Sequence, residues 1–343
     1  TQHSVKEMQG LGLQPDVLVL RTEKHLPEAL MHKVASFCNV EPSHVVQSED
    51  MPSIYEVPIA MQEQGLDVAI LKRLGMEVGE TPALSQWRDY LARRSAATKC
   101  VRIALVGKYS LQDAYKSIRE SLQHAGVYND RKVEIVFVDS QFLTRENVAE
   151  SLAPMAGVVI CPGFGERGTE GKIQAAEYCR THDIPTFGIC YGMQMMVVEF
   201  ARNVLGLAGA NSAEIDPDTR YNVIDIMEEQ KKITRMGGTM RLGAYPCTLK
   251  QGSKAAAIYG KDSISERHRH RYEFNNAFRA DYERAGMSCT GTNPDADLVE
   301  IVEIPTHRWY LATQFHPEYH STVLHPHPLF MSFVKAAVDY SGE

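Results

Sequence analysis

The sequence predicts an α/β protein whose larger part is a doubly wound, mainly parallel sheet. Short apolar runs alternate with segments of helical periodicity from residue 100 onward, and glycine-rich turns follow several of these runs. A continuous apolar run such as 101–109 is typical of a strand that is buried on both faces. Sites in such folds lie at the C-terminal ends of the strands, so the glycine-rich turns are candidate functional positions.

The chain of 343 residues is long enough for about two domains. We expect an α/β fragment at 1–80, a linker at 81–99 and the main domain at 100–343. In the fragment, the patterns predict strands at 16–22 and 44–50, a helix at 26–40 and a loop at 51–58. The linker contains Pro82, a short helix at 84–93 and the small-residue stretch 95–98.

The main domain is predicted to repeat a strand–helix unit. Its expected strands are 101–109, 132–140, 157–165, 184–190 and 309–315. Its expected helices are 113–124, 147–154, 170–182 and 192–205. This alternation is the signature of a parallel sheet covered by helices on both faces.

Composition excludes several functional classes. A formal net charge of −7 argues against a general nucleic-acid or membrane-surface binder. No apolar run approaches the ~18 residues of a spanning helix, and the first residues lack a signal-peptide pattern. Seven cysteines without paired C-x-x-C spacing indicate reduced thiols in a cytoplasmic protein and no zinc site. Because the chain does not begin with Met, we expect it to be part of a longer protein.

The stretch GICYGMQ, residues 188–194, places Cys190 between glycines where a strand gives way to a helix. Such a turn projects a nucleophile outward, and the following helix N-terminus favours the thiolate. The amide of Tyr191 is placed to donate to an oxyanion. The alternative interpretation is that Cys190 is a small buried apolar residue, as most cysteines in soluble proteins are.

The stretch WYLATQFHPEYH, residues 309–320, offers a base for this nucleophile. His316 stands just past the end of an apolar strand, and Glu318 follows two residues later, where its carboxylate can reach the imidazole. Taken alone, His316 could equally be a histidine bonded to backbone at a strand end, and Glu318 a solvated charge.

Together, GICYGMQ and FHPE resemble the catalytic motifs of the class I (triad) glutamine amidotransferases. The resemblance implies that Cys190 is the nucleophile, His316 the general base and acid, and Glu318 the group that orients the imidazole. It also assigns the loop 162–165 to an oxyanion hole, together with Tyr191. The family commonly has Pro-Gly-Gly-Phe-Gly, whereas this loop has one glycine fewer. The resemblance therefore leaves open whether Gly163 or Phe164 supplies the second donor.

Further stretches resemble the CTP synthase family over nearly the whole chain: 1–22, 37–46, 51–58, 107–126, 162–178, 209–217, 237–247 and 266–276. This resemblance implies that glutamine hydrolysis supplies ammonia for the ATP-dependent amination of UTP to CTP. Residues 1–80 would then be the C-terminal fragment of the amidoligase (synthetase) domain. L-Glutamine would be held by Gln194, Glu214 and Arg271.

The run ERHRHRYE is basic, and strand periodicity places Arg267, Arg269 and Arg271 on one face, with His268 and His270 on the other. A nucleic-acid patch is one interpretation, but the acidic balance of the chain and the resemblance favour carboxylate binding by Arg271. Arg267 and Arg269 could equally be structural ion-pair residues.

The resemblance also implies nucleotide contacts. GGTMRLG, residues 237–243, matches a mobile lid linked to activation by GTP, with Arg241 as an anion contact and Lys108, Asp113 and Lys116 nearby. The alternative interpretation is that Lys108 and Lys116 are a solvated pair of lysines. In the first segment, positions that match the UTP and ATP sites are Gln2, Arg21, Lys33, Phe37 and Asp50. Taken alone, Phe37 would be a core residue and Lys33 a surface one.

No stretch matches the phosphate-binding pattern G-x-x-x-x-G-K-[ST]. The nearest candidate is Gly171-Lys172, but Ile173 follows where the pattern requires Ser or Thr. We therefore expect the chain to perform only the glutaminase half-reaction, without a metal or cofactor. ATP, UTP, Mg and GTP, and assembly into a homo-oligomer (a tetramer in the family), belong to the full-length enzymes. The alternatives are a free-standing γ-glutamyl hydrolase and a non-catalytic nucleotide-sensing or filament-forming module.

Overall fold

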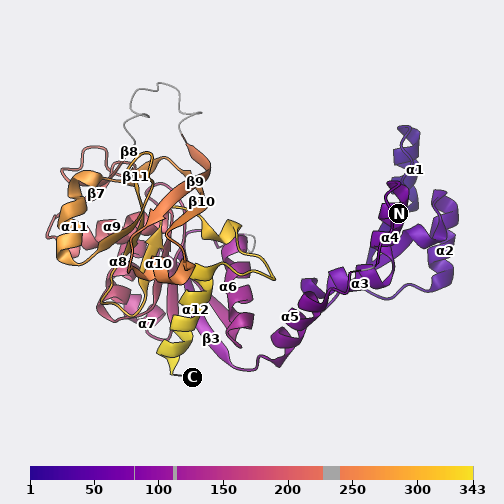
Figure 1. Ribbon diagram of the computed structural model, residues 1–343, viewed down its shortest axis with the longest axis horizontal. Helices are drawn as coiled ribbons and strands as arrows, with labels where there is room; N and C mark the ends of the chain where they lie inside the picture. The colour runs from indigo at the N-terminus through magenta and orange to yellow at the C-terminus, as the bar shows by residue number, and fades with distance from the viewer. Residues whose placement is uncertain (81, 111–113, 227–239, 343) are drawn as a thin grey trace. The chain divides into compact units, whose positions relative to one another are not determined.

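The computed structural model describes residues 1–80, 82–110, 114–226 and 240–342 (Figure 1). The chain divides into two compact units, Thr1–Ala92 and Arg93–Glu343. The division falls inside helix α5 (Ser85–Ala96), within the segment 81–99 that the sequence predicts to be a linker.

The first unit is a small α/β unit. Strands β1 (Leu18–Thr22) and β2 (Val45–Glu49) pair in parallel. Its first two helices, α1 (Gln2–Gly10) and α2 (Glu28–Cys38), enclose a small core with these strands. The fully or nearly buried side chains of that core are Val5, Leu20, Val34, Ala35, Cys38, Val40 and Val45.

The segment 51–58 is not the loop that the sequence predicts. A 3₁₀ turn over Ile54–Glu56 leads directly into α3 (Val57–Glu63), which is followed by α4 (Leu66–Arg73). The hydroxyl of Ser53 accepts a hydrogen bond from the Tyr55 amide at 3.3 Å, and Pro58 lies in the first turn of α3. Both are helix-start signals, and they outweigh the loop composition of this stretch.

The second unit is built on a sheet of nine strands in the order β10-β9-β12-β13-β14-β6-β5-β3-β4. Five of them pair in parallel: β3 (Cys100–Gly107), β4 (Lys132–Asp139), β5 (Gly157–Ile160), β6 (Thr186–Ile189) and β14 (Tyr310–Thr313). The predicted α/β fold with a parallel, doubly wound core is thus confirmed. The strands are shorter than predicted: β5 ends before Pro162, which has no amide to donate to a neighbouring strand.

The other half of the sheet is antiparallel, which the strand–helix alternation did not predict. It consists of β13 (Val299–Glu303), β12 (Ser288–Thr292), β9 (Arg241–Leu249) and β10 (Ser263–His270). A separate three-stranded sheet contains β7 (Asn211–Ser212), β8 (Asn222–Ile226) and β11 (Tyr272–Phe274).

Helices cover both faces of the parallel half (Figure 1). Ala104 and Val106 of β3 belong to a core layer that also contains buried side chains of α7 (Val148–Leu152), α8 (Thr169–Thr181), α9 (Tyr191–Asn203) and α11 (Arg279–Ala285). Ile103 and Leu105, which point to the opposite face, belong to a second core layer that also contains buried side chains of α6 (Lys116–Tyr128), α10 (Lys254–Tyr259) and α12 (Pro328–Ser341). Alternate side chains of β3 therefore belong to two separate hydrophobic layers, one on each face of the sheet.

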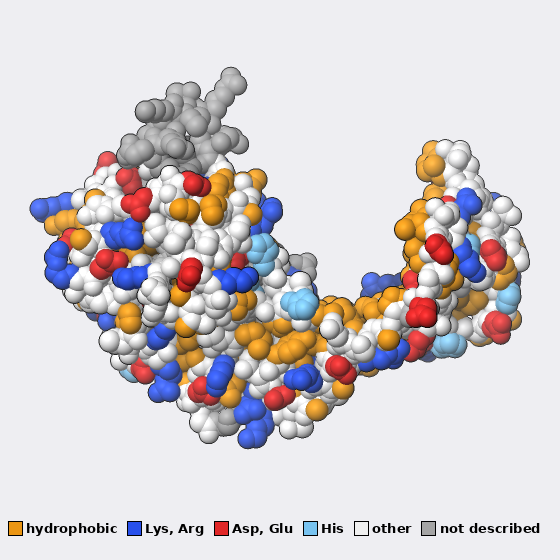
Figure 2. Space-filling view, in the orientation of Figure 1, with side chains coloured by type: hydrophobic (Ala, Val, Ile, Leu, Met, Phe, Trp, Pro, Cys, Tyr) orange, Lys and Arg blue, Asp and Glu red, His pale blue; other side chains and the backbone are white. Residues whose placement is uncertain are grey.

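Two further features are the distribution of charge on the surface and the apolar length of the helices. On the face drawn in Figure 2, acidic and basic side chains of the larger unit are interspersed. Within the described residues, no helix is both long enough and apolar enough to cross a membrane.

The neighbouring position of β6 and β14 brings distant parts of the chain together. The two strands run in parallel with Ile189 opposite Thr313. Immediately beyond this pair, the Cys190 amide donates a hydrogen bond to the Thr313 carbonyl at 2.7 Å. The two predicted motifs, GICYGMQ and FHPE, therefore emerge from the same edge of the sheet.

Candidate active site

Cys190 sits in a sharp turn between β6 and α9. Its backbone has φ 53° and ψ −107°, a region that residues with a side chain rarely occupy and that costs roughly 1–3 kcal/mol. The flanking glycines make the turn possible. A Cβ atom on Gly192 would lie 1.9 Å from the Ile160 carbonyl oxygen, and one on Gly188 would lie 2.3 Å from Sδ of Met196. Strained backbone that is held by close packing is typical of functional sites.

The Cys190 thiol has two hydrogen-bond partners and lies at the start of a helix. Nε2 of Gln314 donates to Sγ at 3.7 Å, while the thiol can donate to the Arg269 carbonyl at 3.9 Å. Cys190 is also the N-cap of α9, so the first amides of that helix lie beside it.

His316 lies beyond the end of β14 and is fixed on both sides. Its Nδ1 donates to Oε1 of Glu318 at 2.7 Å, and its backbone amide donates to the Arg267 carbonyl at 2.8 Å. The ring stacks on Tyr319 with centroids 5.3 Å apart. Because both His316 and Glu318 are buried, this hydrogen bond holds the imidazole in one orientation.

The charges around His316 favour its imidazolium form. Desolvation by burial is the largest single effect and lowers the pKa, but the charges of Cys190 and Glu318 and hydrogen bonds to both outweigh it. The net result raises the pKa of His316 to about 11. With Nδ1 bonded to Glu318, Nε2 is the nitrogen left to interact with Cys190. A thiol that faces an imidazole fixed by a carboxylate is the arrangement of a nucleophile and its base.

The loop 162–165 borders the same pocket. Its last residue is held on both sides: the Gly165 amide donates to Oε1 of Glu214 at 2.9 Å, and the Gly165 carbonyl accepts from the Tyr191 hydroxyl at 2.8 Å. The ammonium of Lys108 donates to the Phe164 carbonyl. Gly163 and Phe164 line the pocket, and Phe164 is 67% exposed.

The predicted glutamine-binding residues line this pocket too. Its volume is about 570 Å³, and Gln194, Glu214 and Arg271 lie around it with Cys190 and His316. Desolvation raises the pKa of Glu214, although the Gly165 amide and the charges of Lys108 and Arg271 counteract it. A carboxylate and a guanidinium in one pocket can together bind a zwitterion.

Gln194 presents an acceptor to the site. Its Nε2 donates to the Tyr272 carbonyl at 2.9 Å and to Oε1 of Gln314 at 3.1 Å. Its own Oε1 is buried and has no partner within the described part of the chain. A buried acceptor of this kind is satisfied when a ligand brings a donor to it.

In β10 the charged residues alternate as the periodicity predicts. Arg267 and Arg269 are exposed, while His268 and His270 are buried. His268 contacts Oε2 of Glu300 at 2.7 Å and Nε2 of His270 at 2.8 Å. The histidines therefore belong to a buried network rather than to a surface.

The described residues among those predicted for the lid and for GTP lie in different surroundings. Arg241 is buried, with its guanidinium 2.7 Å from Glu300 and 3.5 Å from Glu273, so it is committed to two carboxylates. Lys116 lies at the start of α6, paired with Glu120 at 2.7 Å. Lys108 is buried beneath the loop 162–165. Asp113 and the lid residues 237–239 lie outside the described residues.

The predicted nucleotide-site residues of the first unit are exposed. Arg21 and Asp50 form a 3.5 Å ion pair at the adjoining ends of β1 and β2. Lys33 and Phe37 lie one turn apart on α2, and Phe37 is 64% exposed rather than part of the core. Gln2 begins α1.

Sequence reasoning missed two residues that contact parts of the site from behind the pocket lining. Gln314 lies in the predicted strand before His316, yet its amide reaches Cys190. Lys172 of α8 is 0% exposed and donates to the Cys161 carbonyl at 2.5 Å. The only local signal for Lys172 was its position after the glycine of the E-G-K stretch.

Comparisons with known proteins point to one family. Residues 110–336 match the family described as "Glutamine amidotransferase class-I", and residues 1–76 match "CTP synthase N-terminus". Among solved structures, the chain is similar to the glutaminase domain of Trypanosoma brucei CTPS with bound acivicin. The identity is 37% and the TM-score 0.66, over 70% of this chain and 94% of that one.

Curated relatives extend the similarity to nearly the whole chain. The CTP synthase of Bacteroides thetaiotaomicron is 65% identical over 341 residues, which cover 99% of this chain and 64% of the relative. That of Porphyromonas gingivalis is 55% identical over 339 residues, or 98% of this chain and 63% of the relative. The chain thus spans slightly less than two thirds of the length of these relatives.

Proposed function

Since the chain belongs to the class-I glutamine amidotransferase family, among the glutaminase domains of CTP synthase, we propose that it hydrolyses glutamine to glutamate and ammonia. The observation that carries this proposal is one pocket that contains Cys190, His316 bonded to Glu318, and both a carboxylate (Glu214) and a guanidinium (Arg271). A thiolate, an oriented imidazole and a zwitterion site are the parts that hydrolysis of an amino-acid side-chain amide requires.

The proposed reaction has two steps. In the first, Sγ of Cys190 attacks the side-chain amide carbon of glutamine, and His316 gives its proton to the leaving nitrogen, which departs as ammonia. In the second, His316 takes a proton from water, whose oxygen attacks the thioester, and the Cys190 sulfur leaves as glutamate forms. Glu318 orients the imidazole and stabilises its charge in both steps.

Substrate binding follows from the charges around the pocket. Glu214 is proposed to pair with the α-ammonium group and Arg271 with the α-carboxylate. Oε1 of Gln194 would accept a hydrogen bond from the bound glutamine. These contacts hold the ends of the amino acid while its amide reaches Cys190.

We further propose that the ammonia serves the ATP-dependent amination of UTP to CTP, with GTP as effector, in the full-length protein. The match of residues 1–76 to the CTP synthase N-terminus favours this over a free-standing γ-glutamyl hydrolase. We infer that the first unit does not form an ATP–Mg site by itself, because its sequence lacks a phosphate-binding loop.

The test uses the purified 343-residue chain. We expect it to release glutamate and ammonia from glutamine, and the Cys190→Ala variant to release neither while keeping its circular dichroism spectrum. With ammonia, UTP, ATP and magnesium, the chain should make no CTP. Ammonia bypasses the glutaminase site, so steady CTP formation would contradict the proposal for the first unit, whereas failure to hydrolyse glutamine would contradict the proposal for the second.

A further inference from the structure

Lys172 is a buried cation in the first turn of α8, directly beneath the loop 162–165. Its side chain is 0% exposed, and its ammonium donates to the carbonyls of Cys161 at 2.5 Å and Pro162 at 3.3 Å. The ammonium also lies 5.0 Å from the centre of the Tyr191 ring. Among the described residues, no carboxylate is within ion-pair distance of it. Burying a charge costs free energy, so a lysine held only by carbonyls and a ring needs an explanation.

Peptide geometry links Lys172 to the pocket. In a trans peptide the carbonyl of one residue and the amide of the next point in opposite directions, and no cis peptide occurs in the described chain. The neighbouring peptide shows the effect: Lys108 holds the Phe164 carbonyl, and the Gly165 amide points away to Glu214 at 2.9 Å. By the same rule, a Pro162 carbonyl drawn toward buried Lys172 turns the Gly163 amide toward the open pocket.

We propose that Lys172 is a positioning residue that holds the Pro162 peptide so that the Gly163 amide, together with that of Tyr191, donates to the oxyanion formed during glutamine hydrolysis. This inference rests on the proposed function. It also selects Gly163 over Phe164 as the loop donor. A preorganised amide at this place stabilises charge that develops only in the transition state, so Lys172 acts on kcat rather than on substrate binding.

The electrostatic environment of Lys172 adds a pH signature. Desolvation by burial is the largest effect on its pKa and lowers it, as does the nearby Lys108, while Cys161 and Cys190 raise it. The net result lowers the pKa of Lys172 to about 8. The other titratable side chain in contact is Tyr191, whose hydroxyl is bonded to Gly165 and Thr169. A neutral amine is a weaker donor than an ammonium, so the hydrogen bond from Lys172 to the Pro162 carbonyl weakens as the pH rises through about 8.

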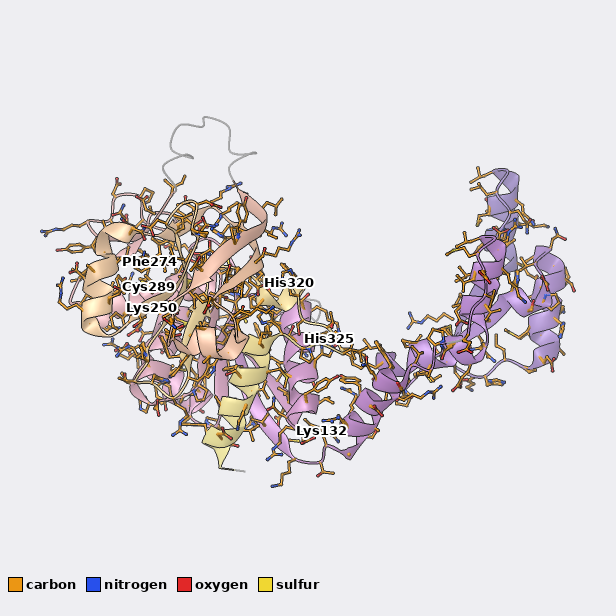
Figure 3. All side chains as sticks on the ribbon, in the orientation of Figure 1. Lys132, Lys250, Phe274, Cys289, His320 and His325 are labelled. Carbon is orange, nitrogen blue, oxygen red and sulfur yellow. The ribbon has the colours of Figure 1, made fainter. Side chains whose placement is uncertain are left out.

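The test replaces Lys172 by methionine, which is also unbranched and fills similar space. Because loss of an oxyanion donor costs about 10²–10³ in rate and the Lys172→Met change only misaligns one, kcat should fall about 10–100-fold. KM should change less than about threefold, because the ground-state contacts remain. Wild-type kcat should decline above pH 8, and the variant should lack this decline. The matched control is Lys132→Met, an exposed lysine at the start of β4, which should behave as wild type (Figure 3).

Alkylation of Cys190 by iodoacetamide separates two roles for Lys172. This reaction requires the thiolate but forms no oxyanion, so its rate should be the same in Lys172→Met and wild type. An alkylation rate that falls together with kcat would show that Lys172 acts on the sulfur, and an unchanged kcat would show no role; either result overturns the proposal. If Lys172→Met does not fold, Lys172→Gln retains a donor for the carbonyls and should keep more activity than a variant of Cys190 or His316.

A direct readout keeps this inference separate from the proposed function. The ¹H–¹⁵N amide signal of Gly163, compared between wild type and Lys172→Met, reports the orientation of the loop whether or not glutamine is hydrolysed. A shifted signal supports the positioning role, and an unchanged signal overturns it. A wild-type chain without glutaminase activity would instead refute the proposed function.

Discussion

Nε2 of Gln314 lies 3.7 Å from Sγ of Cys190, and both side chains are buried. The orientation of the Gln314 amide is fixed because its Oε1 accepts a hydrogen bond from Gln194 at 3.1 Å. The donor is thus directed at the sulfur, on which the helix N-terminus and the His316 imidazole also act. These contacts single out Cys190 among the seven cysteines and underlie the first prediction.

A glutamine-mimicking electrophile should label Cys190 alone. Burial raises the pKa of Cys161, Cys179 and Cys289 to about 12, so these thiols stay protonated at neutral pH. Peptide mapping by mass spectrometry after stoichiometric labelling is the measurement. Label on Cys161 or Cys179 would contradict the assignment, and the exposed Cys100 serves as an internal control for non-specific alkylation.

Removing His316 should cost more activity than neutralising its partner. His316→Ala loses the proton carrier and should reduce kcat by roughly 10³-fold or more, whereas Glu318→Gln keeps a side chain of the same shape and should reduce it less. Steady-state glutamate release measures both. A larger loss in Glu318→Gln than in His316→Ala would reverse the two roles.

Glu214→Gln should weaken glutamine binding. The change removes the charge that faces the bound ammonium, worth roughly 1.5–3 kcal/mol, while the new side-chain oxygen can still accept from the Gly165 amide. We therefore expect KM to rise with kcat nearly unchanged. Because burial raises the pKa of Glu214, wild-type binding should also weaken earlier on acidification than an ordinary Glu would allow. An unchanged KM with a reduced kcat would argue against a ground-state role.

Glu266 should stabilise the fold around the active-site turn. Its buried carboxylate accepts from Tyr259, His320 and His327, each at 2.9 Å, and His320 follows the turn that carries His316 (Figure 3). Glu266→Gln should lower the free energy of unfolding at pH 7 by roughly 1.5–3 kcal/mol, the magnitude of hydrogen bonds to a charged group. Chemical denaturation is the measurement, with the exposed Glu134→Gln as control.

The same residue gives a pH dependence with a defined sign. Desolvation would raise the pKa of Glu266, but hydrogen bonds and charge from His327, with Tyr259 and His320, lower it below its ordinary 4.5. A carboxyl with a lowered folded-state pKa contributes stability above its unfolded pKa and loses it as the pH falls through the folded value. The difference between wild type and Glu266→Gln should thus be full above about pH 4.5 and shrink below it. A difference that is independent of pH would contradict this account.

The sequence predicts the parallel half of the fold and misses the antiparallel half for a physical reason. Strands such as β3 are continuous apolar runs, whose burial can be recognised locally. Strand β13 carries Glu300 and Glu303, yet both are buried. Arg241 and His268 contact the first, and the amides of Lys254 and Ala255 donate to the second. Charged residues in a strand predict that the strand is exposed, because the residues that pair with them in the fold are distant in the sequence.

The same contrast holds within the candidate site. Cys190 and His316 could be proposed because flanking glycines and strand ends are visible along the chain. Lys172 could not, because a lysine on a helix reads as solvent-exposed, and its carbonyl partners come from the loop after β5. The geometry of Gln314 likewise depends on the pairing of β14 with β6.

The adjacency of β6 and β14 makes the site modular. Within the described residues, all the antiparallel strands lie between Ile189 and Tyr310 in the chain, yet the strands that lead to Cys190 and His316 are joined directly by hydrogen bonds between β6 and β14. The intervening chain adds a further contact, from the His316 amide to the Arg267 carbonyl. Its length does not set the distance between Cys190 and His316. Evolution or engineering can therefore splice new segments into it, for example at the exposed turn of Gln251 and Gly252, and give the same chemistry a different acceptor, regulator or reporter.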